Sequence, residues 1–328
     1  INKQSGWQGC NLTEINGGMC NTEEDFYKAC RAASILGTLQ AGYTDFRFLS
    51  DTSKKIFDRE ALLGVSITGW MNNPDILFNE KILEKGAKIV RDTNKKIASI
   101  IGINPAARTT CVKPSGNASV LLQTASGIHA EHSDMYIRNV QLNKESEITQ
   151  AIIKSNPYMV EESVWSAGGT DVVVSFPILP NKGSIYKDDL IGVKHLELVK
   201  KAQKHWVDTG TNEDLCADKG VRHNVSNTIL VDDWDEVEKY VFENRHSFAG
   251  ISFLSMMGDK DFNQAPNTAV IDEKEMVKKY GAASIFASGL VVDALKVFPN
   301  LWDACSTAQG FGMDISLESS ENSARQDW

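Results

Sequence analysis

Apolar positions recur at helical spacing in four segments of the chain. In residues 23–41, Phe26 and Cys30 fall on one face, and Thr22 with the acidic residues after it forms a capping-box-like start. Gly102 supplies a stop signal where a second apolar stripe ends. This spacing predicts three further helices, over 82–101, over 191–206 and from 233 onward.

Short apolar runs lie between these helices and predict strands. They cover residues 172–176, 228–231 and 250–254. Continuous apolar runs of this length are typical of strands buried on both faces. Helices that alternate with such strands require crossover connections, so we expect an α/β fold with a largely parallel sheet. The chain shows no repeat and no low-complexity linker, which predicts one domain over residues 1–328, although the pattern does not distinguish an open sheet from a barrel.

Charge and composition exclude several classes of protein. The chain has 34 basic and 43 acidic residues, a net charge of -9, which argues against a broad basic face that coats nucleic acid. It has no run of about 18 apolar residues and no basic start followed by an apolar run, so we expect neither a membrane span nor a secretory signal. Its 6 cysteines are scattered and form no CxxC pair. A reducing, cytoplasmic setting is therefore expected.

The segment richest in small and hydroxyl residues is 108–119. It contains Pro114, Ser115, Gly116, Asn117, Ala118 and Ser119. A loop with a glycine, two hydroxyls and free backbone N–H groups that opens a helix can wrap a phosphate. The alternative is a plain turn in which Ser115 or Ser119 caps the next helix. The glycine spacing matches neither a Walker loop nor a dinucleotide fingerprint.

Two histidines three residues apart, His129 and His132, flank the carboxylate of Glu131 and could lie on one helical face. The pattern differs from HExxH and lacks a third ligand, so a structural role is favoured and no metal site is predicted. His195 falls on the apolar stripe of its helix, which favours a hydrogen-bonded core histidine. His205, His223 and His246 show no informative spacing.

Cys10 precedes the first predicted helix, in the segment Cys10-Asn11-Leu12-Thr13-Glu14-Ile15-Asn16. Composition alone favours an inert, buried thiol over a redox or nucleophilic one. However, this segment and the helix after it resemble the Cys-Asn-Leu-x-x-Ile-Asn segment and next helix of the catalytic chain of ribonucleotide reductases. Residues 113–119 and 126–129 are similar to the substrate-phosphate loop of that family and the turn after it.

The resemblance is strongest to the adenosylcobalamin-dependent class II enzymes. It rests on Lys-Pro-Ser-Gly at 113–116 and on the segments 250–254, 258–260 and 264–266. It spans most of residues 10–310 in the same order. It implies the second half of a ten-stranded α/β barrel, in which Cys10 is oxidised to a disulfide as the ribose is reduced. It also implies that residues 114–119 hold the nucleotide phosphates.

The resemblance further implies a C-terminal portion, truncated at both ends, of a longer enzyme. The radical cysteine of that family lies upstream, in an Asn-x-Cys-x-Glu motif that this sequence lacks, and Asn11 and Glu14 do not form one. The missing N-terminal half would carry this motif and the redox partner of Cys10, so the isolated chain is expected to be inactive. The implied cofactor is adenosylcobalamin, and the implied partners are a ribonucleotide, as di- or triphosphate, and a thioredoxin-like reductant.

Two alternatives stay open. One is a class I large-subunit fragment, although such chains carry a Tyr-Tyr pair that is absent here. The other is a non-catalytic module that binds nucleotide or phosphate. The glycyl-radical class is disfavoured, because the sequence has no Arg-Val-x-Gly-Tyr near its end.

Overall fold

The computed structural model describes residues 6–256, 264–269 and 274. The described residues divide into two compact units, the first formed by residues 6–131 and 183–256 and the second by 132–182, 264–269 and 274. Compact units of this size also occur inside single domains, so the expectation of one domain stays a prediction.

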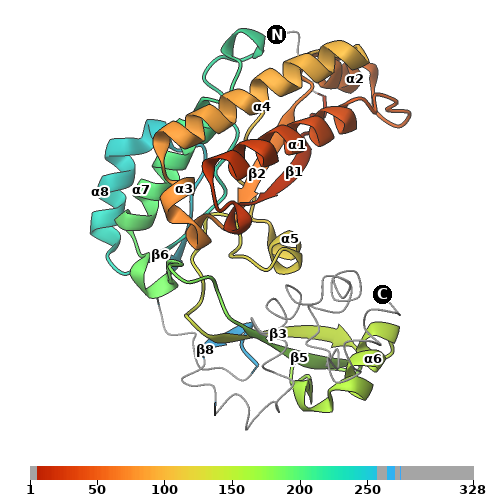
Figure 1. Cartoon of the computed structure of the whole chain (residues 1–328), viewed down its shortest axis with the longest axis vertical. Coiled ribbons are helices and arrows are strands. Elements are labelled where there is room, and N and C mark those ends of the chain that lie inside the picture. Colours follow the sequence, from red (N-terminus) through yellow and green to blue (C-terminus); the bar gives the residue numbers. More distant parts are fainter. Residues whose placement is uncertain (1–5, 257–263, 270–273, 275–328) are drawn as a thin grey trace. The chain divides into compact units, whose positions relative to one another are not determined.

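Parallel strands form the centre of the first unit (Figure 1). β1 (Asn11–Asn16) pairs with β2 (Leu63–Thr68), with Asn11 opposite Leu63. On the other edge of β2, residues 108–112 run parallel, because Val65 N–H donates to Thr109 O and Cys111 N–H donates to Val65 O. A second parallel pair joins β6 (Thr228–Val231) to β7 (Ser252–Ser255). The predicted parallel α/β arrangement is thus confirmed for this unit.

Helices connect these strands. The helices of the first unit are α1 (Glu23–Ala41), α2 (Asp51–Glu60), α3 (Pro74–Leu77), α4 (Glu80–Ile101), α5 (Gly116–Leu121), α7 (Val193–Ala202) and α8 (Trp234–Asn244). A π-helical segment, η5 (Gln203–Asp208), continues α7. Single 3-10 turns occur at Gly17–Met19, Trp70–Asn72, Lys187–Asp189, Glu213–Leu215 and Arg245–Ser247. Among the described residues, no helix is long and apolar enough to cross a membrane.

Local sequence explains where the two long helices begin and end. The Thr22 hydroxyl accepts a hydrogen bond from Asp25 N–H at 3.2 Å, and the Asp25 carboxylate accepts one from Thr22 N–H at 3.1 Å. This reciprocal pair is the predicted capping box. α4 begins after Asn79, whose side chain accepts from two backbone N–H groups, and it ends at Gly102 with φ +78°, a left-handed conformation that glycine adopts without strain.

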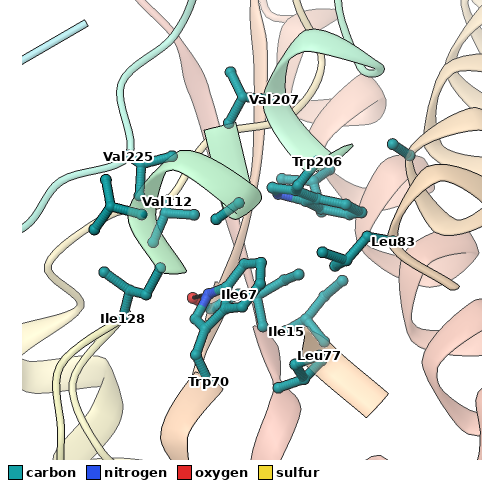
Figure 2. Packing of buried hydrophobic residues seen from close by; sticks show 14 of the residues in the cluster. Ile15, Ile67, Trp70, Leu77, Leu83, Val112, Ile128, Trp206, Val207 and Val225 are labelled. Carbon is teal, nitrogen blue, oxygen red and sulfur yellow. Dashed lines mark hydrogen bonds between the residues drawn. The ribbon is translucent and has the colours of Figure 1, made fainter. Parts of the chain in front are cut away.

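The core lies between the parallel strands and the helices α1, α4 and α7. α1 contacts β1, β2 and α4, and α4 contacts η5. Figure 2 shows Ile15 and Ile67 from the strands beside Leu83 of α4 and Trp206 of η5. The rings of Phe26 and Trp206 lie 5.9 Å apart. The apolar faces of β1 and β2 are therefore turned toward the helices, and their opposite faces are left for other side chains.

The second unit contains an antiparallel sheet in the order β4-β5-β3-β8. Its elements are β3 (Tyr136–Asn143), α6 (Glu147–Ser155), a 3-10 turn (Pro157–Met159), β4 (Val160–Glu162), β5 (Asp171–Ile178) and β8 (Asn267–Ala269). Ile152 of α6 packs with Met159, Val174 and Phe176 in a separate small core.

Two predictions for the strands are wrong. The 172–176 run forms part of β5 but pairs in antiparallel fashion with β3, because an apolar run specifies a strand and not its direction. The 250–254 run forms β7, yet Phe253 is 38% and Leu254 51% exposed, so this strand is not buried on both faces.

Candidate active site

The face of the parallel strands turned away from the core carries polar and thiol side chains. Side chains of a strand alternate between its two faces, so Ile15 lies in the core and Cys10, Glu14 and Asn16 share the other face. Gly64, Ser66 and Thr68 of β2 occupy the same face beside them. Residues 108–113, which run along the other edge of β2, add Cys111 and Lys113 to this face. All these residues belong to the first unit.

Cys10 and Cys111 meet over a glycine. A Cβ placed on Gly64 would lie 2.8 Å from Cys10 Sγ and 3.0 Å from Cys111 Sγ. The two sulfurs thus occupy the space that a side chain at this position would fill. Cys10 is half-buried and Cys111 is buried, and burial raises the pKa of both thiols, that of Cys10 to about 11. Both are therefore protonated at neutral pH.

Cys10 and Cys111 are close but cannot form a disulfide in this arrangement. Their segments lie on opposite edges of β2, two strand spacings apart. Two spacings amount to about 9.5 Å, whereas disulfides join Cα atoms about 4.4 to 6.8 Å apart. The redox partner that the resemblance implies for Cys10 is not Cys111 unless the backbone moves.

His223 faces Cys10 from a segment distant in sequence. Its Nε2 lies 3.9 Å from Cys10 Sγ, and its Nδ1 lies 3.1 Å from Thr110 O. Burial lowers the pKa of His223 to about 4, so the ring is neutral at pH 7. Sequence spacing did not single out this residue, since 213 positions separate it from Cys10.

Glu14 is the carboxyl group of this face. Ser66 Oγ donates to Glu14 Oε1 at 3.1 Å and accepts from Lys113 N–H at 2.9 Å. Burial raises the pKa of Glu14 to about 7, while the Ser66 hydrogen bond and the Lys113 charge act in the opposite direction. A carboxyl with this pKa can hold or release a proton near neutral pH.

The predicted phosphate loop follows this strand and leads into α5. Ser115 occupies the N-cap position in a left-handed conformation, φ +50°, but its side chain makes no capping hydrogen bond. It instead lies 2.5 Å from Thr68 Oγ1, and Ser119 Oγ donates to Gly116 O at 2.9 Å. Ser115 thus stands at the N-cap position, but neither its side chain nor that of Ser119 caps the helix, and the alternative of a plain turn stays open. The first N–H groups of α5 are left without intrahelical partners by helix geometry.

The other loop residues differ in accessibility. Pro114 and Gly116 are exposed, Ala118 is half-buried, Ser119 is buried, and the Asn117 side chain lies outside the described residues. A Cβ at Gly116 would meet no atom within 4 Å. Nearby, Asn16 Nδ2 donates to Leu122 O at 2.9 Å, and Asn16 Oδ1 is a buried acceptor with no partner among the described residues. The loop is thus open at Gly116, and the buried Asn16 Oδ1 nearby accepts no hydrogen bond from the described residues.

Hydrogen bonds hold two further histidines, His129 and His195, within the first unit. His129 Nδ1 lies 2.8 Å from Ser126 O, and its Nε2 accepts from Thr228 N–H at 2.9 Å. His195 is buried, with Nε2 2.9 Å from Ile128 O, as predicted. Glu131 accepts from the Asn72 amide at 2.8 Å. Within the described ranges, no group of three or more His, Cys, Asp or Glu side chains could hold a metal ion.

The other described cysteines are unbridged. Cys20, Cys30 and Cys216 are buried and free, and burial raises the pKa of each. Cys305 and the 258–260 motif lie outside the described residues. The thiol best placed for chemistry on this face is therefore Cys10.

The π-helical segment η5 supports the strand that carries Cys111. Trp206 Nε1 donates to Cys111 O at 3.0 Å, and Thr110 Oγ1 donates to Trp206 O at 2.7 Å. π-Turns inside helices are rare and concentrate at functional sites. The sequence predicted a continuous helix here and did not reveal the π-turn.

Comparison with known proteins confirms the resemblance. No family model matches the chain. The chain is 28% identical over 205 residues to a probable adenosylcobalamin-dependent ribonucleoside-triphosphate reductase of Dictyostelium discoideum, covering 61% of this chain and 26% of that protein. It is 24% identical over 282 residues to the adenosylcobalamin-dependent ribonucleoside-triphosphate reductase of Euglena gracilis, covering 82% of this chain and 36% of that protein.

A solved structure shows the same fold. The crystal structure of a B-12 dependent, class II ribonucleotide reductase matches with a TM-score of 0.67 and 18% identity, over 82% of this chain and 40% of that one. The chain therefore has the fold of the corresponding part of that enzyme, and it spans well under half the length of the proteins it matches. The complete ten-stranded barrel stays a prediction.

Proposed function

We propose that this chain forms part of the catalytic barrel of an adenosylcobalamin-dependent ribonucleotide reductase. One observation carries the proposal: Cys10 and the predicted phosphate loop lie on one face of β1, β2 and the parallel segment 108–112. They are linked through Ser66, Thr68 and Lys113. In parallel sheets, ligands bind beyond the carboxyl ends of the strands, which is where this loop lies. A nucleotide held there by its phosphates extends over the face that carries the thiol.

In the proposed reaction Cys10 is a reductant. Two thiols give up two electrons and two hydrogens, the ribose 2′ carbon exchanges its hydroxyl for hydrogen, and water and a disulfide are formed. Cys10 supplies one of these thiols, and its partner belongs to the rest of the enzyme. A thioredoxin-like dithiol then reduces the disulfide by thiol exchange.

The substrate is a ribonucleoside triphosphate in this proposal. The relatives of Dictyostelium and Euglena are named triphosphate reductases. Ser115 and Gly116 present the open start of α5, which suits an anion. Asn16, whose buried Oδ1 has no partner among the described residues, lies opposite Thr68, the residue that contacts Ser115.

Adenosylcobalamin is the cofactor of the complete enzyme in this proposal. Its cobalt–carbon bond supplies a radical that must reach a cysteine. In the resembling family that cysteine lies in Asn-x-Cys-x-Glu, which the sequence lacks. The described residues therefore fit the reductant and phosphate-binding parts of the reaction and not the part that receives the radical.

The second candidate is a module that binds nucleotides without reducing them, since the open start of α5 would suit a phosphate whether or not a thiol reacts beside it. Reconstitution separates the two. The chain is combined with a polypeptide carrying the upstream half of the barrel, then supplied with adenosylcobalamin, a dithiol and the four ribonucleoside triphosphates. We expect deoxyribonucleotides to form. A complex that binds triphosphates but forms no product, while a full-length class II enzyme is active in the same assay, would establish the binding module instead.

A further inference from the structure

The pairing of Cys10 with His223 carries an inference beyond the resemblance. We infer that His223 is a catalytic residue that accepts and returns the proton of the Cys10 thiol. The inference rests on the proposed function, in which Cys10 Sγ is a reacting atom. Their contact, 3.9 Å between Cys10 Sγ and His223 Nε2, is within the reach of a hydrogen bond to sulfur.

The backbone fixes which nitrogen of His223 faces the thiol. Thr110 O can only accept, so Nδ1, at 3.1 Å from it, carries the hydrogen of the neutral ring. Nε2 is then left with a lone pair toward Cys10. The segment that carries His223 is itself held in place, because Arg108 Nε donates to Val221 O at 2.9 Å and Gln203 Nε2 donates to His223 O at 3.3 Å. A fixed ring and a fixed tautomer are what a positioned base requires.

Burial keeps both partners of the pair neutral at rest, and the nearby charges modify its effect. Arg108 and Lys113 disfavour a positive charge on His223, and Glu60, which pairs with Arg108 at 2.9 Å, has the opposite effect. Lys113 also lowers the pKa of the Cys10 thiol, so its charge favours the thiolate. Burial is the largest influence on the pKa of both groups: it outweighs Lys113 at Cys10 and acts together with Arg108 and Lys113 at His223. The proton therefore stays on sulfur until the sulfur forms a new bond.

The proposed step balances as a thiol–disulfide exchange. Cys10 Sγ attacks a disulfide sulfur, one S–S bond forms as another breaks, and the electron pair of the broken bond leaves with the departing thiolate. The Cys10 proton moves to His223 Nε2 and then to that thiolate. In the reverse direction, when a dithiol opens the Cys10 disulfide, His223 takes the proton of the attacking thiol and returns it to Cys10 Sγ.

The test uses the 328-residue chain and an uncharged disulfide, 2-hydroxyethyl disulfide, whose own reactivity does not change with pH. The rate of mixed-disulfide formation at Cys10 is followed by peptide mass spectrometry from pH 6 to 8. With His223 as base, the wild-type rate should be nearly independent of pH. In His223→Asn, which can still donate to Thr110 O, the rate at pH 7 should fall by at least about ten-fold, since positioned bases contribute about 100-fold or more.

The pH profile separates this role from a structural one. In His223→Asn, and in His223→Gln as a second variant, the rate should rise about ten-fold per pH unit with the thiolate fraction. His246, an exposed histidine on the 3-10 turn Arg245–Ser247, supplies the control: His246→Asn should behave as wild type, and thermal unfolding checks that each variant is folded. Equal rates in wild type and folded His223 variants, or a wild-type rate that also rises ten-fold per unit, would overturn the inference. Exchange is measured without reductase activity, so failed reconstitution together with His223-dependent exchange would reject only the proposed function.

Discussion

Ser66 Oγ of β2 donates a hydrogen bond to Glu14 Oε1 of β1, the residue directly opposite it in the parallel register. The same hydroxyl accepts from Lys113 N–H, at the entrance to the phosphate loop. One serine thus joins the two strands and the loop, and the carboxyl beside it is held where burial disfavours its charge.

Glu14 should make stability depend on pH. Its pKa rises from 4.5 to about 7 on folding, so between these values the folded state keeps a proton that the unfolded state has lost. The free energy of unfolding therefore falls as pH rises through this window, by at most about 3 kcal/mol. Glu14→Gln should remove that fall and be more stable than wild type at pH 8, with little difference at pH 4.5. Chemical denaturation at several pH values measures this, and parallel curves for the two proteins would contradict it.

Gly64→Ala should be destabilising. The added Cβ would lie 2.6 Å from Leu12 Cδ2 and within 3.0 Å of the two sulfurs, and overpacking of this kind costs about 1 to 3 kcal/mol. Cys111→Ala in the same chain should recover part of the loss, because the two changes share one space. Gly116→Ala, where a Cβ meets no atom within 4 Å, is the matched control and should change stability by less than about 1 kcal/mol. If the effects of Gly64→Ala and Cys111→Ala on the free energy of unfolding simply add, the Gly64 Cβ and the Cys111 sulfur do not compete for this space.

Gly116→Val should weaken triphosphate binding and leave the fold intact. In the free chain this position is open, and the left-handed residue of the loop is Ser115 rather than Gly116, so the cost arises only against the ligand. We expect at least a roughly ten-fold rise in Kd, about 1.4 kcal/mol, by titration calorimetry, with an unchanged unfolding midpoint. An unchanged Kd in the folded variant would exclude residues 114–119 as the phosphate site.

Cys10→Ser should stop repeated turnover in the reconstituted enzyme. A serine hydroxyl cannot form the disulfide, so the variant with a dithiol reductant should form less than one product per enzyme. Radical formation from adenosylcobalamin, followed by electron paramagnetic resonance, should persist because the radical cysteine lies in another motif. Loss of the radical would place Cys10 on the radical path, and full activity would remove it from the reaction.

The 328-residue chain by itself should form no deoxyribonucleotide. It lacks the Asn-x-Cys-x-Glu motif, and Cys111, the thiol beside Cys10, is held too far away along the backbone to form a disulfide with it. The measurement is product formation with adenosylcobalamin, dithiol and all four ribonucleoside triphosphates. Turnover by this chain would mean that the role assigned to Cys10 is wrong.

Features set by neighbouring residues were predictable from sequence. The capping box of Thr22 and Asp25 and the stop at Gly102 were both foreseen, because each depends on residues within one helical turn. The buried His195 followed from its place on an apolar stripe. Resemblance, rather than periodicity, singled out Cys10 and residues 114–119.

Features that depend on residues far apart in the sequence could not be predicted from it. His223 and Cys10 are 213 positions apart and meet only because β2 and the 108–112 segment bring their surroundings together. The apolar run in β5 carried no information on strand direction, and its antiparallel partner β3 lies about thirty residues earlier. Gly64 gave no local signal either, since its role is to leave space for two sulfurs on other strands.

The alternation along β1 has an evolutionary consequence. Ile15 faces the helices and Glu14 faces the thiols and the loop, so adjacent codons are subject to different selection. Substitutions at core-facing positions such as Ile15 are selected through the stability of the protein. Substitutions at positions such as Glu14 are selected through its activity. A lineage can therefore exchange one chemistry for another on this strand while its scaffold stays unaltered. The reverse holds as well, since drift in the scaffold need not disturb the reaction.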